Sequence, residues 1–193
     1  MKVAIIKYNA GNVRSVTNAL KRLGVEPVIS DDKDILLSAD KVIFPGVGEA
    51  STAMNYLRHK ELDSLLPKLK MPFLGVCLGL QLMCEYTEEN DTSCLGIFPQ
   101  HVKRFSPGKK VPHMGWNTIG DLKGGLLAGI DEGSYLYFVH SYYAELSENT
   151  IASSKYGEDF SAAVHKDNFY AVQAHPEKSS KTGAQILENF LEL

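Results

Sequence analysis

The sequence predicts an α/β fold: an open, mostly parallel, flavodoxin-like sheet flanked by helices, with antiparallel strands in the C-terminal half. Two observations predict this class. Short apolar strands alternate with amphipathic helices over roughly the first 90 residues, and β-branched and aromatic segments separated by turn residues follow. The length of 193 residues, with 44% hydrophobic and 22% charged side chains, is typical of a single domain that spans residues 1–193.

The first half alternates between strands and helices. Residues 2–6 form an apolar strand, and in residues 11–24 apolar side chains recur three and four positions apart, as on one face of a helix. Further strands are predicted at 25–30, 41–44 and 72–76, with a long helical stretch at 48–70 and a helix after Cys77. Because such strands pair in parallel, we expect their carboxyl ends to meet at one edge of the sheet.

The second half predicts a mixed sheet with antiparallel hairpins, closed by a helix at 182–193. Strands are expected within residues 95–105, 135–146, 150–156, 160–166 and 169–175. Residues 103–118 are predicted to form the one long loop, a kind of segment that often carries function in α/β proteins.

Composition and charge exclude several classes of protein. The net charge is −3 and charges of both signs are mixed along the chain, so no basic surface for nucleic acid or membrane is expected. No apolar run approaches the about 18–20 residues of a membrane span, and no signal-peptide core follows Met1. The three cysteines include no C-x-x-C, which suits neither a disulfide framework nor a zinc site. We therefore expect a cytoplasmic protein with reduced thiols and no metal or cofactor.

Cys77 lies at the centre of the sequence GVCLG, residues 75–79, between a predicted strand and a predicted helix. This is the form of a nucleophile elbow with cysteine in place of serine, in which small flanking residues permit a sharp turn. The sulfur would then lie at a helix N-terminus, where N–H groups favour a thiolate. A buried core cysteine beside tightly packed glycines is the alternative, and both interpretations stay open on this motif alone. Cys84 and Cys94 are interpreted as core or structural residues.

The sequence AHPE, residues 174–177, offers a base for such a thiol. His175 ends an apolar strand. Pro176 disfavours helical backbone at His175 and has its own φ fixed near the extended range, so residues 175–177 are expected to be extended. Side chains two positions apart on extended chain share a face, so Glu177 is expected to orient the imidazole of His175. Together with Cys77 these residues predict a catalytic triad.

The remaining histidines are weaker candidates. His59, His101 and His165 are expected to be solvated or to have structural roles. His113, in the predicted loop, is interpreted as a surface contact. His140 follows an aromatic strand and is expected to line a pocket.

A second glycine turn, Pro45-Gly46-Val47-Gly48, ends the strand 41–44. This turn would lie at the same edge of the sheet as the elbow. The backbone N–H of Val47 or Gly48 could therefore join that of Leu78 as donors to an oxyanion.

The three motifs PGVG, GVCLGLQLM and QAHPEKS together resemble the triad (class I) glutamine amidotransferases, whose fold is an open α/β sheet. The resemblance implies hydrolysis of the side-chain amide of L-glutamine through a γ-glutamyl thioester on Cys77. His175 would be base and acid, and Glu177 its orienting partner. Further residues are implied to bind the substrate: Gly48, Gln81, Ser141 and Tyr142.

Within this family the motifs GNVRSV, PGVG, HMGWN, YFVHSYY and HPEKS resemble those of glutaminases that work with a (β/α)8-barrel cyclase subunit, which implies a heterodimer. The implied interface residues are Pro112, Trp116, Asn117, Tyr137 and Lys178. For Trp116, the alternative is a loop aromatic that folds back onto the domain. The chain departs from the family pattern at Lys7, Asn9 and Ala174, none of which belongs to the triad.

Two other functions remain open at this stage. The chain could serve another synthase, of the anthranilate or aminodeoxychorismate type, although PGVG and HMGWN argue against it. It could also be a non-catalytic flavodoxin-like module or a redox-sensing cysteine protein. A cysteine protease is disfavoured because no feature predicts an extended peptide cleft.

Overall fold

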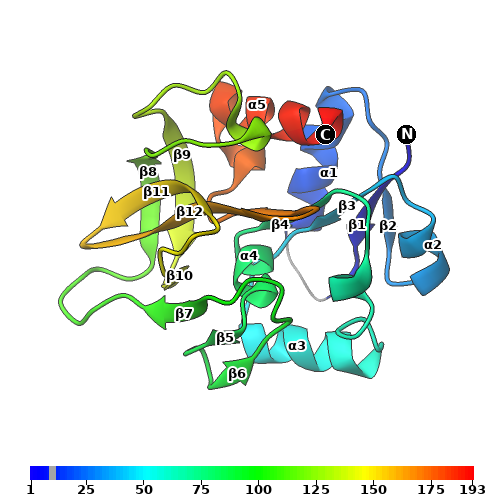
Figure 1. Cartoon of the computed structure of the whole chain (residues 1–193), viewed down its shortest axis with the longest axis horizontal. Helices are drawn as coiled ribbons and strands as arrows, with labels where there is room; N and C mark the ends of the chain where they lie inside the picture. The colour runs from blue at the N-terminus through cyan, green and yellow to red at the C-terminus, as the bar shows by residue number, and fades with distance from the viewer. Residues whose placement is uncertain (9–11) are drawn as a thin grey trace.

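The computed structural model describes residues 1–8 and 12–193, and it is built around a seven-stranded sheet in the order β11-β12-β13-β4-β3-β1-β2 (Figure 1). The strands from β2 to β13 in this order are parallel to their neighbours. Strands β12 and β11 continue the sheet in antiparallel pairing. The predicted fold class is confirmed, including the flavodoxin-like order of the parallel strands.

The structure places the elements in the following order. They are β1 (Val3–Ile6), α1 (Val13–Arg22), β2 (Val28–Ser30), α2 (Lys33–Leu37), β3 (Lys41–Phe44), α3 (Ala50–His59), η1 (Leu66–Lys68), β4 (Phe73–Val76), α4 (Leu78–Met83), β5 (Tyr86–Thr87), β6 (Thr92–Ser93), β7 (His101–Arg104), β8 (His113–Thr118), η2 (Gly125–Leu127), β9 (Tyr135–His140), β10 (Tyr142–Ala144), β11 (Thr150–Tyr156), β12 (Glu158–Lys166), β13 (Phe169–Val172), η3 (Pro176–Lys178) and α5 (Ser180–Glu192). Two smaller sheets accompany the large one, in the orders β10-β7-β5-β6 and β8-β9.

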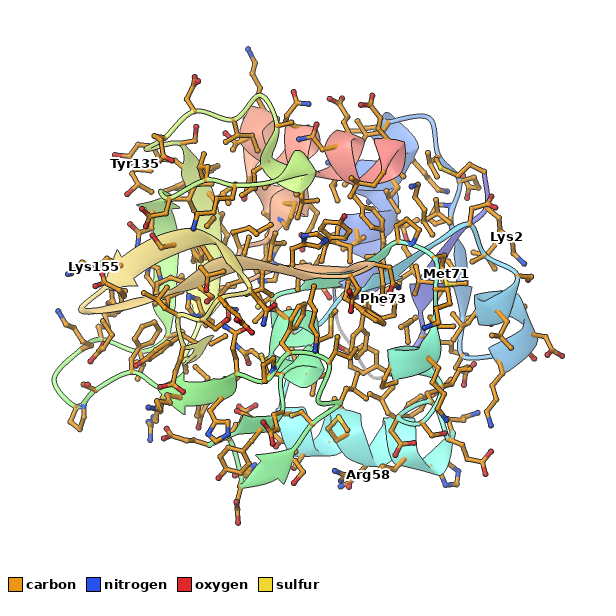
Figure 2. All side chains as sticks on the ribbon, viewed as in Figure 1. Lys2, Arg58, Met71, Phe73, Tyr135 and Lys155 are labelled. Atoms are coloured by element: carbon orange, nitrogen blue, oxygen red, sulfur yellow. The ribbon has the colours of Figure 1, made fainter. Side chains whose placement is uncertain are left out.

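The central strands are buried on both faces. Along β1, Val3 and Ile5 pack in a core cluster with α1 and α5, whereas Ala4 and Ile6 pack in a second cluster with α3 and α4. Figure 1 shows these two pairs of helices on opposite sides of the sheet. Phe73 of β4 lies in the crowded centre of Figure 2 and is 0% exposed. This double burial explains why the parallel strands are continuously apolar and not alternating.

Two predicted elements are wrong. The helical stretch expected at 48–70 ends at His59, because Glu61 adopts a positive φ of 54° and Pro67 lies in a separate 3-10 turn. The loop expected at 103–118 contains a strand, since residues 113–118 form β8 and pair with β9. The sequence of residues 113–118 shows no alternation of apolar and polar residues long enough for this strand to be recognised.

The sequence also left α2 unpredicted and joined β9 to β10. Helix α2 has five residues, too few to show a helical period, although Asp32 caps it by accepting from two backbone N–H groups. Strands β9 and β10 belong to different sheets and are separated at Ser141. Within residues 1–8 and 12–193, no helix is long and apolar enough to cross a membrane.

Candidate active site

Cys77 occupies a sharp turn between β4 and α4. Its φ of 54° and ψ of −107° are strained for a residue with a side chain, and its N–H donates to the Val172 carbonyl at 2.8 Å. A Cβ on Gly79 would collide with the carbonyl oxygen of Phe44 in the neighbouring strand. The glycine two positions after Cys77 is thus required for the close approach of α4 to β3. The strained backbone and the small neighbour are the features that the elbow interpretation predicted.

His175 and Glu177 form a buried pair just beyond β13. Nδ1 of His175 donates to Oε1 of Glu177 at 2.9 Å, and the two side chains are 0% and 1% exposed. The expectation that residues 175–177 are extended is wrong after His175, because Pro176–Lys178 form a 3-10 turn. This turn still brings the carboxylate back to the imidazole, so the pairing expected from the sequence is present by a different backbone path.

Electrostatics tie this pair to Cys77. Burial lowers the pKa of His175, but the negative charge of nearby Cys77 and the interaction with Glu177 outweigh burial and raise that pKa to about 10. Burial raises the pKa of Glu177, and the contacts with His175 and Asn12 lower it below its usual value. Among residues 1–8 and 12–193, Nε2 of His175 makes no hydrogen bond. That nitrogen is the one available to exchange a proton at the thiol.

Asn12 is a site residue that the sequence analysis missed. Its Nδ2 donates to Oε1 of Glu177 at 3.1 Å, so one carboxylate oxygen receives both Asn12 and His175. Asn12 stands at the N-cap position of α1, yet its side chain caps no N–H of the helix. An asparagine before a predicted helix is ordinarily interpreted as a cap, and only the three-dimensional structure reveals its contact with Glu177.

A cavity of about 250 Å³ opens beside the sulfur of Cys77. All four residues expected to bind substrate line it: Gly48, Gln81, Ser141 and Tyr142. The other lining residues are Val47, Cys77, Leu78, Glu89, Pro112, Val139 and His140. The structure therefore gathers the elbow, the glycine turn and the β9–β10 connection around one cavity. Glu89 was not anticipated, since no pattern distinguished it from other surface carboxylates.

Gln81 and Gln173 connect this cavity to the thiol. Nε2 of Gln81 donates to the Tyr142 carbonyl at 2.9 Å and to Oε1 of Gln173 at 3.1 Å. Nε2 of Gln173 in turn lies 3.7 Å from Sγ of Cys77. Gln173 is 0% exposed, and its role was missed although it begins the QAHPEKS motif, because its contacts are with Gln81 and Cys77 in a distant part of the chain.

The glycine turn lies directly on the elbow. The N–H of Leu78, an expected oxyanion donor, donates to the Gly46 carbonyl at 3.3 Å. Tyr8 holds the turn by donating from its hydroxyl to the Pro45 carbonyl at 2.5 Å. Gly48 has a φ of 127°, which side-chain-bearing residues rarely adopt. The oxyanion assignments to Val47, Gly48 and Leu78 stay predictions, and that of Leu78 requires its N–H to be released from the Gly46 carbonyl.

The other histidines and cysteines have structural surroundings. His113 is 4% exposed in β8, so the surface contact expected for it is wrong. His140 lines the cavity, in line with the sequence analysis. Cys84 is 0% exposed, and burial raises the pKa of its thiol well above the usual range, as suits a core cysteine.

The residues expected at a partner interface lie on β8, on β9, before β8 and in η3. Trp116 is 53% exposed and packs edge-on against Tyr137, so it does not fold back into the core. Pro112 and Lys178 are also exposed, and Asn117 is half-buried. Of the residues that depart from the family pattern, Lys7 is exposed and Ala174 is fully buried, while Asn9 lies outside the described residues.

An elbow cysteine, a buried His–Glu pair and a neighbouring cavity on an open α/β sheet form the arrangement expected of a cysteine-dependent enzyme. The sequence matches the family "Glutamine amidotransferase class-I" over residues 4–193, and the chain belongs to that family. It is 60% identical to imidazole glycerol phosphate synthase subunit HisH of Bacteroides fragilis (strain YCH46), over 100% of both chains. It is 47% identical to the protein of the same name from Pectobacterium atrosepticum, again over 100% of both.

Solved structures share the fold. A crystal structure of a glutamine amidotransferase superposes with a TM-score of 0.77 at 22% identity, covering 98% of this chain and 97% of that one. PurLQS from Thermotoga maritima gives a TM-score of 0.73 at 16% identity, covering 99% of this chain and 97% of that one.

Proposed function

We propose that the chain is the glutaminase subunit of imidazole glycerol phosphate synthase. It hydrolyses glutamine to glutamate through a thioester on Cys77 and passes the ammonia to a cyclase subunit. That subunit forms imidazole glycerol phosphate and AICAR in histidine biosynthesis. The observation that carries this proposal is the position of Cys77: it lies between the His175–Glu177 pair and a cavity lined by the residues expected to bind glutamine.

The chemistry follows from the positions of the side chains. The thiolate of Cys77 attacks the carboxamide carbon of glutamine and forms a C–S bond, and the carbonyl oxygen becomes an oxyanion. Imidazolium at His175 gives its Nε2 proton to the departing nitrogen, and the C–N bond breaks to release ammonia and leave a thioester. Neutral His175 then takes a proton from water, which attacks the thioester and releases glutamate. Glu177 stabilises imidazolium and holds its Nδ1–H in place throughout.

The cavity walls offer groups for both ends of the amino acid. Glu89 is the carboxylate among the lining residues. Its pKa is raised, mainly by burial, which indicates a partly desolvated position. We assign to it the α-ammonium group of glutamine. The polar groups of Ser141 and Tyr142, which also line the cavity, are assigned to the α-carboxylate.

The oxyanion donors need a change at the glycine turn. In the described conformation the Leu78 N–H is engaged by Gly46, so a developing oxyanion would compete with that carbonyl. We infer that binding of the cyclase subunit and its nucleotide ligand shifts the turn and frees the donors. Glutamine hydrolysis measured with and without the ligand-bound cyclase tests this inference, and equal rates would reject it.

The partner is inferred to be a (β/α)8-barrel cyclase subunit in a heterodimer. Exposed Trp116 supports this assignment, because a large aromatic side chain at the surface is a typical interface anchor. The match over residues 4–193 supports a glutaminase domain, and the relatives named as a subunit of the synthase support a separate partner chain that uses the ammonia. A cytoplasmic location stays a prediction.

A labelling experiment tests the catalytic assignment. A glutamine analogue with an electrophilic group should alkylate the wild-type chain once, at Cys77, and excess glutamine should protect it. Cys77→Ala should abolish both labelling and hydrolysis, while Cys94→Ala, which changes a half-buried thiol outside the cavity, should retain them. Labelling that glutamine does not slow would instead support a sensor thiol and reject the proposed function.

A further inference from the structure

A continuous series of hydrogen bonds leads from β8 to the wall of the cavity. Nδ2 of Asn117 lies 3.4 Å from Nε2 of His113, and Nδ1 of His113 lies 3.1 Å from Nε2 of His140. Nδ1 of His140 lies 2.7 Å from the carbonyl oxygen of Tyr142, which also accepts from Gln81. The series begins near the surface: Asn117 also donates to the carbonyl of Lys155, a residue at the margin of Figure 2.

The chemistry of the end groups fixes the direction of every bond. The Tyr142 carbonyl can only accept, so His140 must carry its proton on Nδ1. Neutral His140 then accepts at Nε2, and His113 donates to it from Nδ1. This leaves Nε2 of His113 as the acceptor for the amide of Asn117. A single set of tautomers satisfies the whole series, with both rings neutral.

The surroundings keep both rings neutral and fixed. His113 and His140 are 4% and 5% exposed, and His113 is stacked on Tyr156 at a centroid distance of 4.1 Å. Burial lowers the pKa of His113 to about 4 and that of His140 to about 3, with His113 and His175 adding charge repulsion at His140. Both rings are therefore neutral near neutral pH, and burial confines them to these hydrogen-bond partners.

The effect reaches the substrate through Gln81. Both N–H groups of its amide are used, one by the Tyr142 carbonyl and one by Gln173. The amide therefore cannot rotate, and Oε1 is the atom that it can offer to a ligand. His140 secures the carbonyl on which this orientation depends, and Tyr142 itself lines the cavity.

We propose that His140, supported by His113, is a positioning residue for glutamine: it fixes the Tyr142 carbonyl and thereby the orientation of the Gln81 amide in the cavity. The inference rests on the proposed glutaminase function. It assigns no proton transfer to either ring, since the proton-carrying histidine of the site is His175.

A pair of substitutions at one position tests this role. Asparagine places its amide nitrogen near the position of histidine Nδ1, whereas glutamine places it near Nε2. His140→Asn can thus keep the donor to Tyr142, and His140→Gln loses it, while both remove a ring from the same aromatic surroundings. Each variant is assayed as the full chain with the cyclase subunit, and KM for glutamine, kcat and the unfolding midpoint are measured.

In His140→Gln we expect KM for glutamine to rise by up to about tenfold, the upper end of the effect of one neutral hydrogen bond, with kcat changed much less. His140→Asn should restore KM to within about threefold of the wild type although its unfolding midpoint falls by a similar amount. Equal KM values in the two variants would overturn the proposal and leave a packing role. If the wild-type complex hydrolyses no glutamine, the proposed function is wrong. If the wild-type complex is active and the two variants have equal KM values, only the positioning role of His140 is wrong.

If neither variant folds, the same comparison is made at His113. His113→Asn keeps the donor toward His140, and His113→Gln loses it. The proposal then requires a higher KM for glutamine in His113→Gln than in His113→Asn, and the same KM in both overturns it.

Discussion

Asn12 donates a hydrogen bond of 3.1 Å to Oε1 of Glu177, although 165 positions separate the two residues in the sequence. The contact exists because α1 begins, and β13 ends, at the same edge of the parallel sheet, where the carboxyl ends of the strands meet. Glu177 is thereby held from two sides, by Asn12 and by His175. The orientation of the base depends on the first helix as well as on the local HPE sequence.

Asn12→Ala should therefore lower kcat for glutamine hydrolysis about tenfold, because a hydrogen bond to a charged group contributes about 1.5 kcal/mol or more. Asn12→Asp should lower it further, since a second carboxylate repels Glu177 and raises its pKa. Steady-state kinetics of the complex provide the measurement. Asn90→Ala is the matched control, because Asn90 donates to a glutamate outside the triad. An unchanged kcat in both Asn12 variants would remove Asn12 from the site.

The pKa of His175, raised to about 10, predicts a titration that depends on Cys77. At neutral pH the imidazole should be protonated in the wild-type chain. Cys77→Ala removes the negative charge next to His175, so the pKa of His175 should fall by about one unit or more. The ¹⁵N chemical shifts of the His175 ring, recorded from about pH 5 to about pH 11 in both proteins, would measure this change in pKa. The assignment of a thiolate–imidazolium pair would be wrong if the two titrations coincided.

The same shift predicts how stability depends on pH. The pKa of His175 is higher in the folded chain than its ordinary value of 6.5, so protonation favours folding. This contribution is complete below about pH 6.5 and is lost as the pH rises through about 10. In urea unfolding, the stability difference between the wild type and His175→Gln should thus shrink from neutral to alkaline pH. A difference that stays constant across this range would contradict the raised pKa.

The elements that chemistry constrains locally were predictable from the sequence. The elbow at Cys77 has glycines where a Cβ would collide, and the 41–44 strand is buried on both faces and so continuously apolar. The His175–Glu177 pairing was also predictable, though by an extended path that the 3-10 turn replaces. The sequence could not predict the roles of Asn12, Gln173 and Glu89, because these roles arise from contacts between segments far apart in the chain. The strand nature of residues 113–118 was missed because its pairing with β9 is a tertiary property.

Gly79→Ala should disrupt the elbow more than its small size suggests. The added Cβ would collide with the Phe44 carbonyl, and backbone cannot give way as a flexible side chain does. We expect the free energy of unfolding to fall by about 1–3 kcal/mol, the usual range for overpacking, together with a loss of glutaminase activity. Gly24→Ala is the control, since its φ of 79° is strained but no atom lies within 4 Å of the added Cβ. That variant should lose about 1 kcal/mol and keep its activity.

Tyr8 offers a test of the glycine turn. Its hydroxyl donates to the Pro45 carbonyl at 2.5 Å, and this contact holds the turn in the conformation in which Gly46 engages the Leu78 N–H. Tyr8→Phe removes the hydroxyl and keeps the ring packed against Phe44. The hydrogen bond between the Leu78 N–H and the Gly46 carbonyl should then break more often. Glutamine hydrolysis without the partner should rise, and the stimulation by the cyclase subunit should become smaller.

The size of this effect follows from one hydrogen bond. Loss of about 1 kcal/mol from the closed conformation corresponds to a rise of about fivefold in the partner-free rate, at a similar cost in stability. Tyr56→Phe is the control, because the Tyr56 hydroxyl donates to Asp31 outside the cavity and should affect stability alone. Rates with and without the partner, measured side by side, provide the comparison. If Tyr8→Phe lowered both rates equally, Tyr8 would support the open turn and not the closed one.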